Sequence, residues 1–185
     1  MRLDFAQLIM RSNTAPLQRS ELTLEQLEPF LATNAPAALA HEALATSQYH
    51  VSCREAGIDD GRRYFQYHIN GERVGLCGYH QRRCDPPHVI WGGFFIASRR
   101  LPGAMKMRMQ FDTLRHILQH TQAHQGYVET YAAPGKSNMH AIWAKLGAVE
   151  SGTLKDFYGP GSDMCIQRID LKALRTSLDA RHCAP

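Results

Sequence analysis

Three β-rich segments between residues 62 and 97 limit the possible folds more strongly than any other part of the sequence. The first two, RYFQYHI and ERVGLCGYH, flank the pair Asn70-Gly71. Asn-Gly suits a two-residue hairpin turn, because both positions of that turn need a positive φ. The third segment, HVIWGGFFIA from His88 to Ala97, is almost continuously apolar, which is typical of a strand covered on both faces. The spacing predicts three strands that form an antiparallel meander.

Helical spacing of apolar residues appears on both sides of these strands. Residues 21–48 carry Leu and Phe at helical intervals and are interrupted by Pro29 and Pro36, so two helices are expected there. A longer helix is expected from Gly103 until Gly126 stops it. Its apolar face is predicted to consist of Met107, Phe111, Leu114, Leu118 and Thr121.

The rest of the chain alternates between the two patterns. YVETYA predicts a strand, a break follows at Pro134-Gly135, and a shorter helix is expected from about Ser137 to Leu146. Two last strands flank the turn YGPGSD, and a polar tail begins at Leu171. This order of elements predicts an α+β fold, a sheet with helices packed on it.

Composition favours a single soluble domain spanning residues 1–185. With 44% hydrophobic and 21% charged residues, the chain is ordinary for a globular protein and long enough for a sizeable core. The net charge of +4 is mild, and the Lys and Arg residues are scattered, so no nucleic-acid partner is expected.

Cysteine usage and the first residues favour a cytoplasmic address. The five cysteines, an odd and widely spread set, indicate reduced thiols and no disulfide framework. The opening MRLDFAQLIMRSN is too short and polar for a signal-peptide core or a membrane span, so no membrane partner is expected either.

The segment GGFFIASRRLPGAMKMRMQFDTL joins the third strand to the long helix and is the clearest candidate for a binding site. A strand that feeds a glycine-containing turn and then a helix start brings together backbone N–H groups and the positive end of a helix dipole. A pyrophosphate would fit such a site. The alternative is a plain strand-to-helix connection, since short glycine motifs occur often by chance.

The same segment resembles the GNAT superfamily of acetyltransferases. In that family the strand is followed by Arg or Gln, two residues, Gly, one residue, and then Gly or Ala. Here Arg100 and Gly103 match, whereas Met105 is bulkier than the family residue. Pro102 also departs from a cradle of N–H donors, because proline has none.

A second part of the resemblance lies near the end of the chain. Lys145, Leu146 and Gly147 match the family's Lys-Leu-Gly-Phe helix end, although Ala148 stands where an aromatic residue is usual. Trp143 stands where the family often has a tyrosine that protonates the departing thiolate. The resemblance covers roughly residues 62–170 and implies a GNAT-like, mostly antiparallel central sheet with helices on both faces, residues 1–50 forming the acceptor side.

The resemblance also implies an activity, an N-acetyltransferase in which a primary amine attacks the thioester of acetyl-CoA directly. It implies that the cofactor is held by Phe95, Ile96, Ala97, Arg100, Leu101, Gly103, Ala104, Met105, Asn138, Trp143 and Lys145. The departures at Met105, Trp143 and Ala148 leave an alternative open, a weak or inactive GNAT-fold module that senses CoA or binds a protein. The expected acceptor is a small, weakly charged amine, and exposed edge strands would suit a homodimer.

Direct attack requires a general base for the amine and an acid near the sulfur. Glu129, within YVETYA, is the first candidate for the base, and the alternative is an exposed strand glutamate. His88 is a second candidate, because its ordinary pKa lies in the useful range. Tyr158 in the turn DFYGPG is the expected acid, where the resemblance also puts a functional tyrosine, and Tyr131 is the runner-up. A tyrosine that only anchors the turn would look the same.

Two patterns have the chemistry of metal ligands, yet no metal is expected. The first pattern would need ligands on alternating faces of a strand and beside two prolines, and the second fits a solvated helix face. They consist of Cys77, His80, Cys84 and His88, and of His116, His120 and His124.

Overall fold

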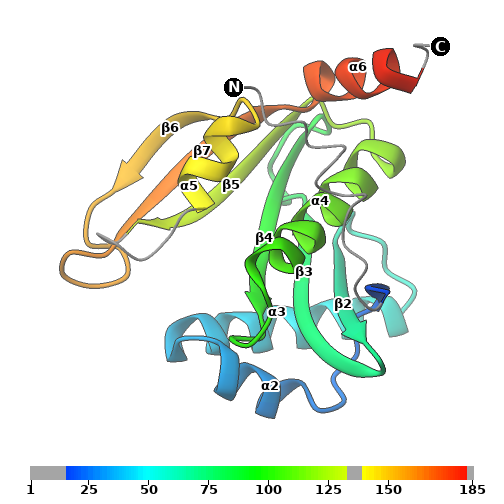
Figure 1. Cartoon of the computed structure of the whole chain (residues 1–185), viewed down its shortest axis with the longest axis vertical. Helices are drawn as coiled ribbons and strands as arrows, with labels where there is room; N and C mark the ends of the chain where they lie inside the picture. Colours follow the sequence, from blue (N-terminus) through cyan, green and yellow to red (C-terminus); the bar gives the residue numbers. More distant parts are fainter. Residues whose placement is uncertain (1–15, 133–138, 183–185) are drawn as a thin grey trace. The chain divides into compact units, whose positions relative to one another are not determined.

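The structure is a computed structural model that describes residues 16–132 and 139–182 (Figure 1). Its seven strands form one sheet in the order β1-β2-β3-β4-β5-β7-β6. The strands are β1 (Gln18–Glu21), β2 (Arg63–Ile69), β3 (Glu72–His80), β4 (Val89–Ala97), β5 (Gln125–Ala132), β6 (Val149–Leu154) and β7 (Asp163–Asp170). The helices are α2 (Leu27–Asn34), α3 (Ala37–Glu55), α4 (Gly103–His120), α5 (Met139–Lys145) and α6 (Leu171–His182). The predicted α+β class, with a mostly antiparallel sheet, is confirmed.

The predicted meander is β2, β3 and β4. Asn70 and Gly71 form the turn between β2 and β3, with φ of 52° and 81°, as a tight hairpin requires. β4 and β5 pair in parallel through Val89–Trp91 and Gln125–Tyr127, whereas β5, β7 and β6 pair in antiparallel fashion.

Four expectations about the elements were wrong. β1 was not predicted, because QRSE is short and every residue in it is exposed, so it shows no hydrophobic alternation. The helix α3 continues to Glu55, beyond the expected end. The helix α4 ends at His120, and Gly126 lies inside β5, where it is covered by Leu171. Residues from Leu171 form the helix α6 in place of a polar tail.

The buried face of α4 also differs from the expected one. Met105, Met109, Leu114, Ile117 and Leu118 are buried, whereas Met107 and Phe111 are only half-buried. The observed buried face is therefore rotated about the helix axis relative to the predicted one. A methionine-rich segment offers several apolar stripes with helical spacing, so the sequence did not single out the correct stripe.

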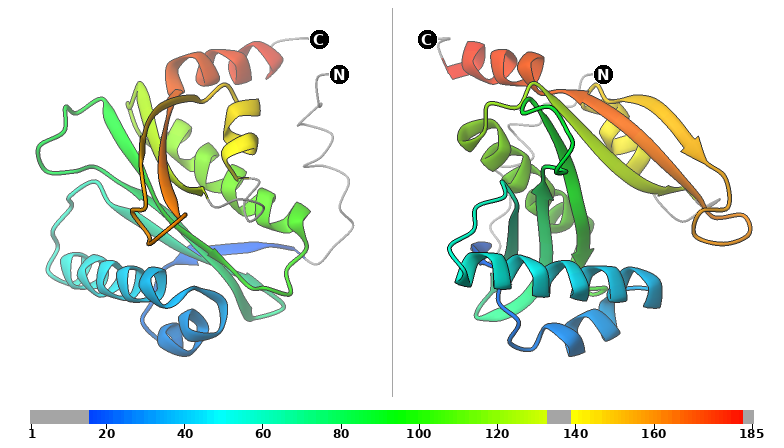
Figure 2. Two further views of the ribbon diagram at one scale, coloured as in Figure 1. Left: turned by 90° about the vertical axis from the view of Figure 1, so that its left-hand side faces the viewer. Right: turned by 180° about the vertical axis from the view of Figure 1, so that it is seen from behind.

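The chain divides into two compact units, Met1–Gly78 with Phe94–His116, and Tyr79–Gly93 with Ile117–Pro185. In the first unit, α2 and α3 lie side by side (Figure 2) and enclose one core with Leu76 and Phe94 of the sheet. The neighbouring position Gly75 meets Met109 of α4 instead. Alternate residues of β3 therefore contact helices on opposite faces. The expected single domain remains a prediction.

In the second unit, α5 packs against β5 and β7, and α6 packs against β5. Arg175 of α6 donates to the carbonyl groups of Leu118, Thr121 and Ala123, which closes the end of α4. Across the described residues of both units, no helix is both long and apolar enough to cross a membrane.

Candidate functional site

The predicted anion site is the loop Ser98–Pro102, which lies in the first unit between the end of β4 and the start of α4. The N–H of Ser98 donates to the Val74 carbonyl at 2.8 Å, which ties the loop to β3. The N–H of Leu101 donates back to the Ser98 carbonyl at 3.0 Å, and the Leu101 side chain is buried. The loop is thus a tight turn anchored at both ends.

Three backbone donors at this turn are unused. Among the described residues, the N–H groups of Arg100, Gly103 and Ala104 have no hydrogen-bond acceptor. The carbonyl of Pro102 starts the helix by accepting from Met105 and Lys106, at 3.0 and 3.1 Å. Orphan donors at a helix start, together with the helix dipole, favour an anion.

The charges around the loop agree with an anionic ligand. Arg99 and Arg100 are exposed, and neither guanidinium has an acidic partner within the described part of the chain. A hydrated, unpaired cationic pair can exchange water for phosphate oxygens at little cost.

The departure from the family pattern at Met105 does not obstruct the turn. The side chain of Met105 is 4% exposed, so its bulk belongs to the core beneath α4. Gly103 is exposed, and a Cβ placed there would meet no atom within 4 Å. The approach to the free N–H groups is therefore open despite the larger residue at 105.

Asn34, which the sequence analysis missed, positions this loop. Its Oδ1 accepts the N–H of Arg99 at 3.1 Å, while its Nδ2 donates to the Phe30 carbonyl at 2.9 Å. The second bond fixes the orientation of the amide, so the acceptor faces the loop. Asparagine is common at the end of a helix, so Asn34 looks like an ordinary helix end in the sequence. No sequence signal connects it to a loop 65 residues away.

The other expected cofactor residues occupy different positions. Phe95, Ile96 and Ala97 end β4, and the Ile96 side chain belongs to the core with α2 and α3. Trp143 is buried in α5, and the exposed Lys145 ends that helix. Asn138 lies outside the described residues, as does the side chain of Tyr131.

Glu129, the first candidate for the base, is ion-paired. Its Oε1 accepts from Arg82 at 2.6 Å, and the Arg82 guanidinium lies 3.4 Å from the centre of the Trp91 ring. The indole of Trp91 donates to Asp85 at 2.7 Å and stacks on Tyr127 at 4.9 Å between ring centres. The loop before β4 and the strands β4 and β5 thus build one polar and aromatic cluster in the second unit.

The remaining catalytic candidates are exposed. His88 precedes β4, its carbonyl accepts from His124 and Gln125, and the two imidazole rings lie 6.1 Å apart. Tyr158 lies on the turn between β6 and β7 with 41% of its surface exposed, and Phe157 packs against it edge to face. Its backbone N–H donates to the Ser162 carbonyl at 3.0 Å, which closes the turn.

The two metal-like sequence patterns do not gather in the described structure. Cys77 is buried beside Gln110, and burial raises the pKa of its thiol to about 11, which disfavours the thiolate a metal needs. Cys84 is exposed. In the histidine pattern, His116 packs on Phe65 at 4.8 Å and His124 lies near His88.

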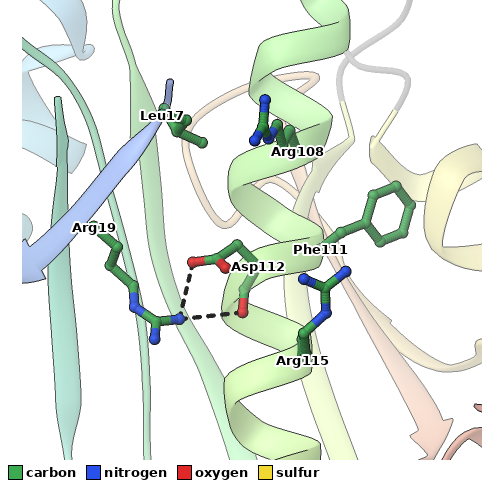
Figure 3. A pocket seen from close by; sticks show the side chains of 6 residues that line it. All are labelled: Leu17, Arg19, Arg108, Phe111, Asp112 and Arg115. Atoms are coloured by element: carbon green, nitrogen blue, oxygen red, sulfur yellow. Dashed lines mark hydrogen bonds and ion pairs between the residues drawn. The ribbon is translucent and has the colours of Figure 1, made fainter. Parts of the chain in front are cut away.

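A basic pocket of about 240 Å³ lies beside the middle of α4 in the first unit (Figure 3). Arg19 of β1 donates to the Asp112 carboxylate at 2.9 Å, so its charge is balanced. The pocket is lined by Leu17, Arg19, Arg108, Phe111, Asp112 and Arg115. None of the residues of the turn lines it, so this pocket is separate from the free N–H groups.

Comparisons with known proteins identify the fold. No family model and no curated protein sequence matches the chain. Among solved structures, a putative GNAT-family acetyltransferase from Desulfovibrio desulfuricans matches with a TM-score of 0.69 at 13% identity, over 84% of this chain and 99% of that one. A spermidine/spermine N-acetyltransferase from Vibrio cholerae matches with a TM-score of 0.62 at 17% identity, over 87% and 96% of the two chains.

A third match is a ribosomal-protein-alanine N-acetyltransferase from Brucella melitensis, with a TM-score of 0.62 at 18% identity, over 83% of this chain and 99% of that one. The second and third of these neighbours are named for different acceptors, and the similarity of all three to this chain extends over nearly their whole length. The chain therefore has the fold of the GNAT acetyltransferases.

Proposed function

We propose that this chain is an N-acetyltransferase that binds acetyl-CoA at the turn Ser98–Pro102 and the start of α4. The observation that carries the proposal is the set of N–H groups on Arg100, Gly103 and Ala104, beside two arginines, that find no partner within residues 16–132 and 139–182. A pyrophosphate supplies the acceptor oxygens and negative charge that these groups lack. The open space at Gly103 lets phosphate oxygens approach the backbone.

Acetyl-CoA would supply an acetyl thioester, and the chain's own residues would orient it and move protons. The amine nitrogen attacks the carbonyl carbon, the carbon–sulfur bond breaks, and the amine loses one proton while the sulfur gains one. Glu129 is proposed as the base, directly or through water, using the carboxylate oxygen that Arg82 does not hold. Tyr158, a phenol open to solvent, is proposed as the acid, and His88 remains the second candidate for the base.

The acceptor is proposed to be a small primary amine. The solved neighbours include enzymes named for spermidine and spermine and for the alanine of a ribosomal protein, so the fold by itself leaves the acceptor class open. The region before residue 50 shows no acidic cluster of the kind that a polycation would need.

A second candidate function is a CoA-binding module without turnover. Trp143 favours it, because an indole stands at the position where the family often has its proton-donating tyrosine, and this indole is 7% exposed. The same turn would bind the cofactor in both cases, so only turnover separates the two functions.

The deciding experiment is a transfer assay with acetyl-CoA and a panel of amines. The panel contains polyamines, amino acids, aminoglycosides and peptides with a free N-terminal alanine. Acetylated product should be measured by mass, because the exposed thiol of Cys84 would itself react with thiol reagents. Transfer to any amine at a rate above the uncatalysed one supports the enzyme, and binding without transfer supports the module.

A further inference from the structure

His140, Glu150 and Cys165 bring three different metal-binding groups together in the second unit. One ligand atom from each, an imidazole nitrogen, a carboxylate oxygen and a thiol sulfur, lies within 4.8 Å of the other two. They come from α5, β6 and β7, and none belongs to the patterns that the sequence suggested for a metal. The cluster shares no residue with the turn that we propose for acetyl-CoA, so a metal here would bind whether or not that turn holds the cofactor.

A β-bulge in β6 places Glu150 in the cluster. Glu150 pairs with Gln167 and Gly152 pairs with Ile166, so Ser151 is an extra residue in the ladder. Glu150 and Thr153 are three residues apart, so in a regular strand they would point to opposite faces of the sheet. The bulge puts them on the same face, where the Thr153 hydroxyl donates to Glu150 Oε1 at 2.7 Å. Bulges often serve to redirect a side chain, and this one turns a carboxylate toward Cys165.

The same threonine holds the thiol. Thr153 is the cross-strand partner of Cys165, and its Oγ1 lies 3.4 Å from the Cys165 sulfur. One hydroxyl therefore positions both the carboxylate and the sulfur, which is the arrangement that orients ligands around bound metals.

Unsatisfied polar atoms surround these groups. Counting only the residues that the structure describes, His140 Nδ1 is buried without a hydrogen-bond partner, and so is Gln167 Oε1, two residues after Cys165 on β7. Gln167 Nε2 donates to the His140 carbonyl at 3.2 Å, which joins α5 to β7 at this point. Buried polar atoms normally have a partner, so two orphans at this point indicate that a polar group or water, such as one carried by a bound ion, completes their hydrogen bonding.

The distance between the histidine and the carboxylate fits zinc. His140 Nε2 and Glu150 Oε2 lie 3.7 Å apart, too far for a hydrogen bond. Two ligands at 2.0–2.3 Å from a tetrahedral zinc ion are separated by about 3.3–3.8 Å, and Cys, His and Glu are all zinc ligands. The mixture of soft and hard donors argues against Ca²⁺ and Mg²⁺, which prefer oxygen alone.

A cysteine–histidine nucleophile does not explain the cluster. Cys165 is 6% exposed, and its contact is with Thr153; within the described residues it has no hydrogen bond to His140. A reactive thiol needs access to its substrate and an activating base. A partly exposed histidine–glutamate ion pair also contributes little to the stability of the fold. Such a pair alone therefore does not explain why β6 contains a bulge that brings Glu150 to this point.

We propose that His140, Glu150 and Cys165 bind one zinc ion, with a fourth position open to water. The ion would join α5 to the β6–β7 hairpin. Since α5 is a short helix of 7 residues, such a link would contribute substantially to holding it on the sheet.

The test uses the full chain without a histidine tag, in the presence of a non-thiol reductant, with Zn²⁺ and Co²⁺ as probes. Zinc should bind one ion per chain with a dissociation constant below about 10 µM. Cobalt bound at the same site should show a thiolate-to-metal charge-transfer band. Zinc should also raise the midpoint of thermal unfolding, because it binds the folded state.

Variants separate this site from others on the chain. Cys165→Ser should abolish the charge-transfer band, and Glu150→Gln should keep the band while weakening zinc binding by at least about 10-fold. Glu150 is half-exposed, so its replacement leaves the core unaffected. Cys84→Ser and His41→Gln, which change an exposed thiol and an exposed imidazole elsewhere, should bind zinc like the wild type. Absence of stoichiometric binding, or binding unchanged in both Cys165→Ser and Glu150→Gln, would overturn the proposal.

Discussion

The side-chain oxygen of Asn34 accepts a hydrogen bond of 3.1 Å from the backbone N–H of Arg99. This bond connects the end of α2 to the turn that carries the free N–H groups. Because the helices before residue 50 form the acceptor side in the family that the chain resembles, the bond would couple acceptor and cofactor sites. If the turn binds acetyl-CoA as proposed, Asn34 is a positioning residue, since its contact is with the loop.

Replacing Asn34 should weaken acetyl-CoA binding with little effect on turnover. Asn34→Ala removes the hydrogen bond to the loop, worth about 0.5–1.5 kcal/mol, together with the bond to Phe30 inside α2, so the dissociation constant for acetyl-CoA should rise about 2- to 10-fold. Asn34→Asp keeps an acceptor for Arg99 but adds a negative charge beside the proposed pyrophosphate, so it should weaken binding more than alanine does.

The control is Thr33→Ala, because among the described residues the Thr33 hydroxyl bonds to Pro29 alone, within the same helix turn. Affinities should be measured by calorimetry, with unfolding curves for each variant. If Asn34→Asp bound acetyl-CoA as well as the wild type, the phosphate could not lie at this turn.

A substitution at Gly103 should weaken acetyl-CoA binding without destabilising the fold. A Cβ at this position meets no atom within 4 Å, and its φ is not positive. Gly103→Val should therefore change the free energy of unfolding by less than about 1 kcal/mol. If phosphate oxygens approach the backbone here, the added methyl groups should weaken acetyl-CoA binding by about 10-fold or more.

Acetyl-pantetheine, which lacks the pyrophosphate, supplies the comparison ligand for Gly103→Val. The rate of transfer from acetyl-pantetheine should change much less than the rate from acetyl-CoA. Equal losses with the two donors would mean that the valine disturbs the thioester and not a phosphate.

Tyr158→Phe tests the proposed acid. The side chain is 41% exposed, so loss of the hydroxyl should leave folding intact. If the phenol protonates the sulfur, kcat should fall about 10²-fold or more while the affinity for acetyl-CoA stays within about 2-fold. The measurement is steady-state kinetics with the best amine of the panel. Unchanged kcat would remove Tyr158 from the mechanism.

The stability of the first unit should depend on pH through Asp59. Two hydrogen bonds from Arg63, at 2.9 and 2.8 Å, and one from the N–H of Gly61 lower the pKa of Asp59 to about 2. The folded pKa is thus below the unfolded value, so the stabilisation is complete above about pH 4 and is lost as the pH falls toward 2.

Asp59→Asn measures this contribution. Because the carboxylate is largely exposed, solvent screens the pair, and the variant should lose less than about 1 kcal/mol at pH 7. Urea unfolding between pH 3 and 7 should show the difference from the wild type shrinking only below about pH 4. A difference that grows on acidification, or one that 1 M salt does not reduce at pH 7, would contradict this account of Asp59.

Much of the sheet could be predicted because its signals are local. The Asn70-Gly71 turn and the apolar run from His88 each determine one element within a few residues, and β2, β3 and β4 formed where expected. The turn before α4 could also be predicted from a local signal, because the neighbouring residues Pro102 and Gly103 mark it in the sequence. The strand β1 escaped notice because β2, and not its own exposed residues, determines its conformation.

The contacts that build the sites could not be predicted, because they join distant segments. Asn34 reaches Arg99, and Glu129 pairs with Arg82, only after strands and helices have assembled. The cluster of His140, Glu150 and Cys165 depends on one extra residue in β6, so strict alternation along the sequence does not give the face on which Glu150 lies. Among the described residues, the histidine and cysteine spacings that the sequence does show form no such three-ligand group.

The most direct test of the central proposal is calorimetric titration of the wild-type protein with acetyl-CoA at fixed salt, which needs no knowledge of the acceptor. The free N–H groups at Arg100, Gly103 and Ala104 predict binding of one molecule per chain with a dissociation constant in the range of about 1–100 µM. A folded, monodisperse protein that shows no binding at about 1 mM acetyl-CoA would contradict the proposed site and the function built on it.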